Sequence, residues 1–163
     1  MLVINKTMSH HDKYETHILR LANQPSDLLD STSNGFFTAK IPGHLRDRDC
    51  YVHTISGTVS NLANIFEGTE DANLVLLRHN ITTQSYDITS KGTDQFFGDC
   101  IRPANNEKIA KLNEDSEKDL GLCRLPPQIE VETVGFLSAT GEYVRLDKAA
   151  HFVEVILRLE FLK

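Results

Sequence analysis

The chain has 163 residues, of which 40% are apolar and 25% are charged, an ordinary composition for a globular protein. This length suits one domain that buries roughly 70% of the surface of its unfolded chain, which is enough to fold without a disulfide or metal. The formal net charge of −6 argues against nucleic acid as a partner, because phosphate binding requires a basic surface.

Residues 1–13 are predicted to form an N-terminal arm. Leu2, Val3 and Ile4 are consecutive aliphatic side chains with no apolar partner in their own segment, and we expect them to contact a neighbouring subunit. Burial there would stabilise the contact by roughly 1.5–3 kcal/mol per side chain, and a strand-like segment can pair with a sheet edge. The alternative is that the arm folds back or frays. The apolar start is too short for a signal peptide, and no stretch reaches a membrane-spanning length.

The first part of the remaining chain alternates between loops and short strands. Residues 14–21 are a weak strand candidate, and residues 23–35, rich in Ser, Asp, Asn and Pro, indicate a long surface loop. Residues 36–41 predict a strand with alternate apolar side chains, which ends at the turn-forming pair Pro42 and Gly43.

The middle of the chain predicts further strands. Residues 50–59 are rich in β-branched and aromatic side chains, which favour strands. Residues 72–81 contain a continuous apolar run at 74–77, which predicts a strand covered on both faces. Weaker strand candidates are residues 84–88 and 96–101.

Residues 107–112 are the candidate for one short helix, with Ile109 and Leu112 facing inward. It leads into residues 113–119, which carry four negative charges and one positive charge. Such a run cannot bury a face, so it predicts a solvated loop or a short exposed helix.

The C-terminal third has the strongest strand signals. Residues 128–133 alternate apolar with polar, and residues 142–146 follow a hairpin turn at Thr140 and Gly141. Residues 151–161 alternate throughout, which predicts a strand with one buried and one solvated face. The predicted buried side chains are Val153, Val155, Leu157, Leu159 and Phe161.

Eight or nine short strands with almost no helix predict an all-β fold. Two packed antiparallel sheets would bury the apolar faces and leave the charged side chains outside. The spacing favours a single jelly-roll β-sandwich of about eight strands over residues 14–163, with long loops and at most one short helix.

No pattern in the sequence indicates a catalytic, cofactor or metal site, and we expect a protein that is not an enzyme. Phosphate-binding glycine loops, zinc motifs and nucleophile motifs are all absent. His10 and His11 are adjacent, and His53 and His79 lie on predicted strands that could approach across a sheet. Two ligands do not complete a metal shell, so hydrogen-bonded histidines are the favoured interpretation.

The cysteines and two carboxylates are the remaining candidates for chemistry. Cys50, Cys100 and Cys123 are an odd number, which together with the missing signal peptide predicts free thiols in a reducing compartment. Cys50 and Cys100 lie among apolar neighbours without a base to activate them, so burial is the favoured interpretation. Asp94 and Asp99 flank two phenylalanines, and nothing distinguishes them from carboxylates at strand ends.

Several segments, over about half of the chain, resemble single jelly-roll capsid proteins. Residues 125–132, 140–142 and 152–159 form an extended proline-containing approach, a strand, a hairpin and a long final strand, as at the C-terminal end of minor capsid or penton-type proteins of large eukaryotic DNA viruses. Residues 36–42 and 50–55 are similar to the first strands of such proteins.

The resemblance implies a structural protein without a cofactor. Such a protein would be made in the cytoplasm of an infected cell and built into a virion with copies of itself and other capsid proteins. The alternative is a β-sandwich module that binds a carbohydrate or a receptor through its loops. Eight Phe, four Tyr and no Trp weaken this alternative, since sugar-binding sites favour Trp and Tyr.

Overall fold

A computed structural model describes residues 13–23, 36–60, 72–82, 87–89, 92–99, 109–112, 116–137, 139–145 and 152–163. The regular elements of these residues are eleven β-strands, without a helix long and apolar enough to cross a membrane. They are β1 (Tyr14–Ala22), β2 (Phe36–Lys40), β3 (Asp49–Ser60), β4 (Ala72–His79), β5 (Asp87–Thr89), β6 (Gly92–Asp94), β7 (Ile109–Leu112), β8 (Lys118–Arg124), β9 (Gln128–Leu137), β10 (Glu142–Arg145) and β11 (Val153–Leu162).

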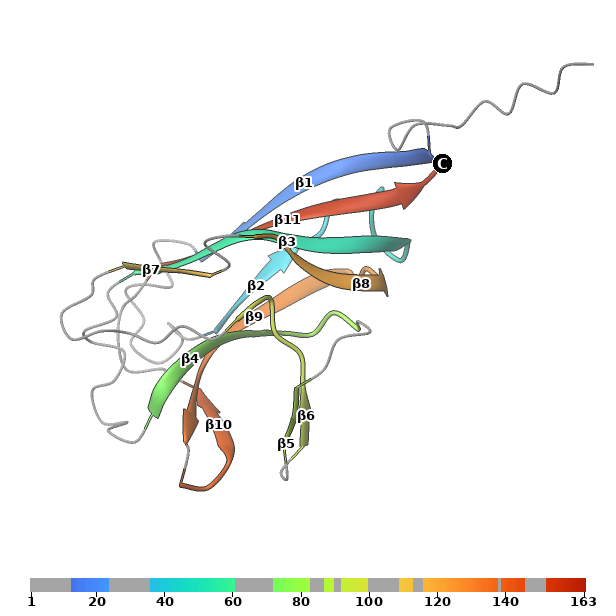
Figure 1. Ribbon diagram of the computed structural model, residues 1–163. Coiled ribbons are helices and arrows are strands. Elements are labelled where there is room, and N and C mark those ends of the chain that lie inside the picture. Colours follow the sequence, from blue (N-terminus) through green and yellow to red (C-terminus); the bar gives the residue numbers. More distant parts are fainter. Residues whose placement is uncertain are drawn as a thin grey trace, which may run out of the picture.

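Two antiparallel sheets pack face to face (Figure 1). In the β11 sheet, β11 lies between β1 and β3, and both β7 and β8 pair with the other side of β3. In the β9 sheet, β2 and β10 follow each other along one side of β9, and β4 pairs with its other side. Strands β5 and β6 form a separate hairpin.

The hydrophobic core fills the space between the two sheets. The inward side chains of β11 are almost completely buried, as the alternation of the sequence predicts, and they meet inward side chains of β4 and β9. Strand β4 also buries Leu76, on the face opposite to Val75 and Leu77, which confirms a strand covered on both faces. The main inward residues are Val153, Val155, Leu157, Leu159, Phe161, Val75, Leu77, Ile129 and Val131.

The expected helix over residues 107–112 is wrong, because Ile109–Leu112 forms β7 and pairs with Gly57–Ser60 of β3. The reason is a close contact. A Cβ atom on Gly57 would lie 2.8 Å from Cδ1 and 3.2 Å from Cβ of Leu112, so a larger residue at position 57 would require Leu112 to shift, and glycine favours this close pairing. A helix of six residues is marginal alone, and pairing with a sheet outweighs it.

The acidic segment 113–119 also differs from the expectation at its end, because Lys118 and Asp119 begin β8. The sequence did not reveal this strand, since its alternation is interrupted. Gly121 has a positive φ of 82°, and the pairing register shifts between Val52 and His53 of β3. Such a bulge breaks the period of two that marks a strand.

The other strand predictions are confirmed with changed limits, except the candidate 96–101. Strand β9 continues four residues beyond the predicted end at 133, and residues 87 and 88 of the candidate 84–88 belong to β5. The candidate 96–101 is wrong over its described residues, because Phe96 makes only an isolated bridge with Arg78 and residues 97–99 form bends. Residues 1–12 of the N-terminal arm and most of the loop 23–35 lie outside the described residues.

Truncation of Leu157 tests the assignment of the inner face. Leu157 is 0% exposed and Leu162 on the same strand is 72% exposed. We expect Leu157→Ala to lower the free energy of unfolding by about 2–5 kcal/mol, through lost burial and a cavity. The same change at Leu162 should stay within about 0.5 kcal/mol. Urea unfolding of dilute protein measures both, and equal effects would contradict the register of β11.

Candidate functional site

The histidines of the sequence analysis do not form a shared site in the described residues. His53 lies on β3 of the β11 sheet, whereas His79 lies on β4 of the β9 sheet. His10 and His11 lie outside the described residues. Among the residues that are described, no group of three or more His, Cys, Asp or Glu side chains could hold a metal ion.

The cysteines and carboxylates have different surroundings. Cys50 and Cys123 are both buried and face each other across β3 and β8, and Cys100 lies outside the described residues. Asp94 accepts a hydrogen bond from Arg78, whereas Asp99 lies 3.8 Å from the ammonium of Lys118. The two carboxylates therefore engage different cations, which does not favour a paired-carboxylate site.

The outer face of the β11 sheet carries an unusual group of apolar side chains. Four large apolar side chains of the described residues are strongly exposed, and each comes from a different strand of this sheet. We call them the apolar face. Its members are Ile18 of β1, Tyr51 of β3, Leu122 of β8 and Leu162 of β11.

Strand pairing brings these side chains together. Tyr51 lies directly opposite Leu122, and Leu162 lies directly opposite Tyr14. The rings of Tyr14 and Tyr51 meet edge to face with centroids 6.1 Å apart, which joins the two pairs across the sheet. Tyr14, Tyr51, Leu122 and Leu162 therefore form one group across neighbouring strands, whereas Ile18, 58% exposed on the edge strand, lies opposite the charged Arg158.

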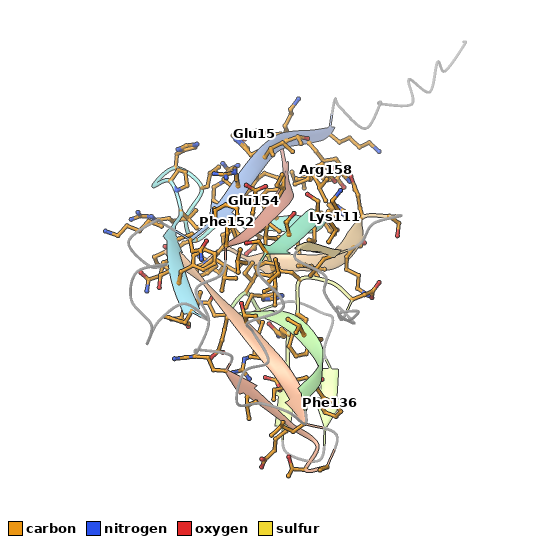
Figure 2. All side chains as sticks on the ribbon, turned by 90° about the vertical axis from the view of Figure 1, so that its left-hand side faces the viewer. Glu15, Lys111, Phe136, Phe152, Glu154 and Arg158 are labelled. Carbon is orange, nitrogen blue, oxygen red and sulfur yellow. The ribbon has the colours of Figure 1, made fainter. Side chains whose placement is uncertain are left out.

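A charged cluster lies on the same outer face. Glu160 is only 7% exposed, and its carboxylate lies 3.2 Å from Nε of Arg158 and 3.6 Å from Nε2 of His53. Arg158, labelled in Figure 2, also donates to Glu117 at 2.7 Å. Asp119 lies 3.7 Å from Nδ1 of His53. Arg158 lies opposite both Ile18 and His53, and Glu160 lies opposite Tyr51, so the charged side chains lie among the members of the apolar face.

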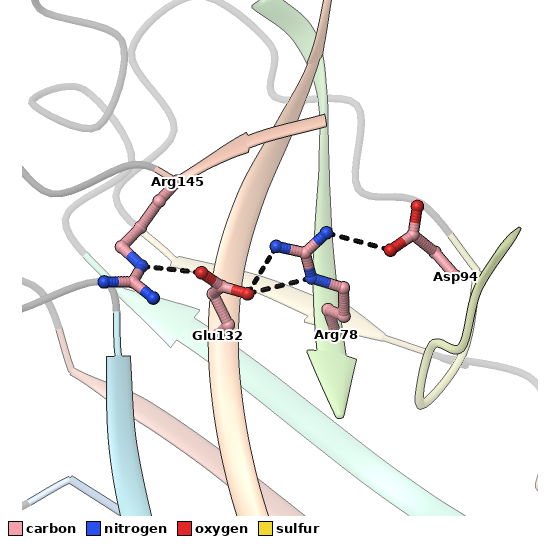
Figure 3. A network of polar contacts seen from close by, with 4 residues as sticks. All are labelled: Arg78, Asp94, Glu132 and Arg145. Carbon is pink, nitrogen blue, oxygen red and sulfur yellow. Dashed lines mark hydrogen bonds and ion pairs between the residues drawn. The ribbon is translucent and has the colours of Figure 1, made fainter. Parts of the chain in front are cut away.

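The outer face of the β9 sheet carries a different arrangement, a network of ion pairs (Figure 3). Arg78 of β4 donates from Nε and Nη2 to one oxygen of Glu132, at 2.8 and 2.5 Å, and from Nη1 to Asp94 at 2.8 Å. Arg145 of β10 donates to the other oxygen of Glu132 at 2.6 Å. The network therefore joins β4, β9, β10 and the end of β6.

The network holds its groups in their charged forms. Burial alone would raise the pKa of Glu132, but hydrogen bonds from Arg78 and Arg145 outweigh it, and the pKa lies below its usual value. Burial would lower the pKa of Arg78, but bonds to Glu132 and Asp94 raise it above its usual value. Each charge is thus compensated within the protein, as partly buried ion pairs require.

A hollow of about 120 Å³ lies beside this network, between β2, β4 and β9. Small-molecule pockets usually enclose roughly 300–1,000 Å³, so the hollow is too small to favour a sugar or another ligand of that size. Its lining consists of Phe36, Arg78, His79, Asn80, Glu130 and Glu132.

His79 is the one buried histidine that lines the hollow. Its ring lies against Phe97, with centroids 4.5 Å apart, and its Nδ1 accepts a hydrogen bond from the backbone N–H of Ile81 at 3.2 Å. Burial lowers the pKa of His79 to about 4, although hydrogen bonding with the backbone of Phe96 and Ile81 acts in the opposite direction. The folded protein therefore holds the His79 ring in its uncharged form at neutral pH.

Sequence reasoning missed the apolar face and the ion-pair network. Ile18 was visible as an apolar side chain on the polar face of an alternating strand, and Leu122 stood in a strand that was not recognised. The network joins Arg78, Asp94, Glu132 and Arg145, which are far apart in the sequence, so only the pairing of the strands reveals it.

Comparison with known proteins gives no match, either to a protein-family model or to a curated protein. The function is therefore inferred from the two outer faces. On the β9 face, Arg78, Asp94, Glu132 and Arg145 compensate one another's charges, whereas the β11 face leaves apolar side chains in water. A group of exposed apolar side chains on one sheet face is typical of a contact surface between proteins.

Replacing Glu132 tests the ion-pair network. Glu132→Gln should lower the free energy of unfolding by about 1–3 kcal/mol, because Arg78 and Arg145 lose a charged acceptor, while the partial exposure of Arg145 limits the cost. Glu154→Gln is the matched control. Its partner Arg20 is largely exposed, so the change should cost less than about 1 kcal/mol. Equal costs in chemical unfolding would contradict a structural role for the network.

His79 predicts that acidification destabilises the fold. The pKa of 6.5 in the unfolded chain falls to about 4 in the folded protein, so the unfolded state binds the proton first. The contribution of His79 to the free energy of unfolding is fully present above pH 6.5. It is lost as the pH falls from 6.5 towards 4, and the loss reaches up to about 3 kcal/mol. Urea unfolding across this pH range measures the loss.

His79→Asn separates this effect from the carboxylates. The Asn side-chain oxygen can still accept from the N–H of Ile81, but it does not titrate. The variant should be less stable overall and show a flatter pH dependence between 6.5 and 4. An unchanged slope would show that other groups cause the acid sensitivity.

Proposed function

We propose that the chain is a structural assembly protein, a jelly-roll subunit of the minor capsid or penton type that forms part of a viral capsid shell. Its partners would be other copies of itself and other capsid proteins, and it would be made in the host cytoplasm and carried in the virion. The observation that supports this proposal best is the apolar face of the β11 sheet.

The apolar face supports association for a physical reason. Apolar side chains on a protein surface gain free energy when a partner removes them from water. Single exposed apolar side chains are common, but a group on one sheet face indicates a contact surface. Tyr51 supplies a large ring with a polar tip, a residue type enriched in interfaces. Arg158 and Glu117 pair with each other on the same face, so their charges are already compensated when a partner approaches.

The strand order supports the jelly-roll part of the proposal. The first strand pairs with the last, β2 with β9, and β3 with β8. Between β3 and β8 in the sequence, Arg78 of β4 makes an isolated antiparallel bridge with Phe96. Such nested antiparallel pairing, divided between two sheets, is the pattern of a jelly roll. The hairpin of β5 and β6, and strands β7 and β10, are additions to it.

The position of residue 13 supports a contact arm. The backbone N–H of Lys163 donates to the carbonyl of Lys13 at 3.0 Å, and Tyr14 lies opposite Leu162. The proposed arm, with Leu2, Val3 and Ile4, is thus connected to the fold beside the apolar face. A neighbouring subunit that covered the apolar face could therefore also bind the arm that precedes Lys13.

Oligomeric state tests the proposal. Size-exclusion chromatography with light scattering should show that the full chain forms a discrete oligomer. Leu122→Lys places a charge in the apolar face and should shift the protein towards monomer without loss of its β-type circular dichroism. Thr38→Lys is the matched control, an exposed position on β2 of the other sheet, and should leave the oligomer intact.

Three results would contradict the proposal. One is a wild-type monomer at all accessible concentrations, and another is an oligomer that Leu122→Lys does not weaken. The third is a monomer retained on a glycan array, which would favour the ligand-binding module instead.

A further inference from the structure

Two buried cysteines face each other across an edge of the β11 sheet. Cys50 of β3 and Cys123 of β8 are directly opposed in the strand register. Both side chains point into the core and are only 1% and 4% exposed. The pairing is independent of the apolar face, so an inference from it does not depend on the proposed function.

The backbone spacing suits a bond between these residues. The N–H of Leu125 donates to the carbonyl of Arg48 at 3.0 Å, so this opposed pair is hydrogen-bonded. Opposed pairs alternate in type along an antiparallel ladder, and Cys50 and Cys123 lie two residues further on. Their Cα atoms are therefore expected about 5.5 Å apart, within the roughly 4.4–6.8 Å that disulfides span.

The side chains are close as well. The pKa of the Cys123 thiol is raised above its usual value by hydrogen bonding with the Cys50 side chain and by burial, in keeping with two side chains that share one buried position. Cβ atoms at a hydrogen-bonded position are about 5.5 Å apart, whereas a disulfide usually takes about 3.5–4.5 Å. A bond here would draw the strands together and carry strain, and strained disulfides are readily reduced.

We propose that Cys50 and Cys123 form a reversible disulfide that links β3 to β8. The thiolate of one cysteine attacks a small disulfide such as oxidised glutathione, which forms a mixed disulfide and releases one glutathione thiolate. The second cysteine then attacks the mixed disulfide and releases the other glutathione. In total, two protein thiols lose two electrons and two protons, and one glutathione disulfide becomes two thiols.

The edge position of β8 gives the oxidant a path. Within the described part of the β11 sheet, β8 forms a ladder only with β3, and its other side makes a single isolated bridge, from Arg124 to Thr82, so β8 is an edge strand over most of its length. Its ladder is interrupted between Val52 and His53, beside Gly121. Edge strands with interrupted pairing open locally at low cost. Reaction is therefore expected to be slow in the closed protein, where burial disfavours the thiolate.

The test uses the folded full chain with Cys100→Ser, which leaves the two proposed partners as the only cysteines. The protein is incubated with oxidised glutathione, treated with iodoacetamide in denaturant, and weighed by mass spectrometry. The proposal predicts loss of both free thiols, seen as a chain that lacks two hydrogen atoms and takes up no alkyl group. Dithiothreitol without denaturant should restore both thiols.

The matched control is Cys123→Ala in the same background, which should give only free Cys50 or its mixed disulfide with glutathione. Peptide mapping of the oxidised wild-type chain provides a second measurement, in case Cys100→Ser does not fold. A linked peptide that contains Cys50 and Cys123 supports the proposal. Free thiols, stable mixed disulfides at both positions, or a link through Cys100 would overturn it.

Discussion

The fold depends on the alternation of β11, the last strand of the chain. Its odd-numbered side chains from Val153 to Phe161 are buried between the sheets, while the strand itself lies between β1 and β3. Strand β11, at the end of the chain, thus pairs with both β1, at the start of the described residues, and β3. Because the period of a strand is two, a slip by one residue would move all five of these buried side chains to the outer face. The inner face therefore fixes the register, and the register determines what the outer face displays.

The two outer faces of the sandwich meet water in different ways. On the β9 sheet, Glu132 lies between two arginines, so its charges are matched within the molecule. On the β11 sheet, a nearly buried Glu160 is held by Arg158 and His53, but apolar side chains around it remain exposed. The Glu132 network is compensated in the isolated chain, whereas the apolar side chains of the β11 sheet would gain free energy if a partner covered them. This difference is the physical basis of the proposed assembly function.

Much of the fold was predictable from the sequence, because alternation is a local signal. The final strand, the buried run of β4 and the turn at Gly141, which has a positive φ of 68°, are all confirmed. Strands β7 and β8 were not, since their formation depends on distant partners. Ile109–Leu112 is a strand because it pairs with β3, where Gly57 leaves room for Leu112. The alternation of Lys118–Arg124 is interrupted by a bulge at Gly121, so it could not be recognised in the sequence.

The candidate surface was less accessible to sequence reasoning than the core. A buried face repeats along one strand, whereas the apolar face takes single residues from four strands. Tyr51 and Leu122 are far apart in the sequence and become neighbours only through the pairing of β3 with β8. The lack of catalytic motifs in the chain gave no information about where an interaction surface lies. The resemblance to capsid proteins named a class of function without the residues that would carry it.

Side-chain footprinting tests the central claim most directly. Carbene or hydroxyl-radical labelling would compare dilute protein with concentrated, assembled protein at single-residue resolution. The account predicts that labelling of Ile18, Tyr51, Leu122 and Leu162 falls on assembly, while labelling on the outer face of the β9 sheet stays constant. Unchanged labelling of these four side chains in a proven oligomer, with protection on the β9 face instead, would contradict it.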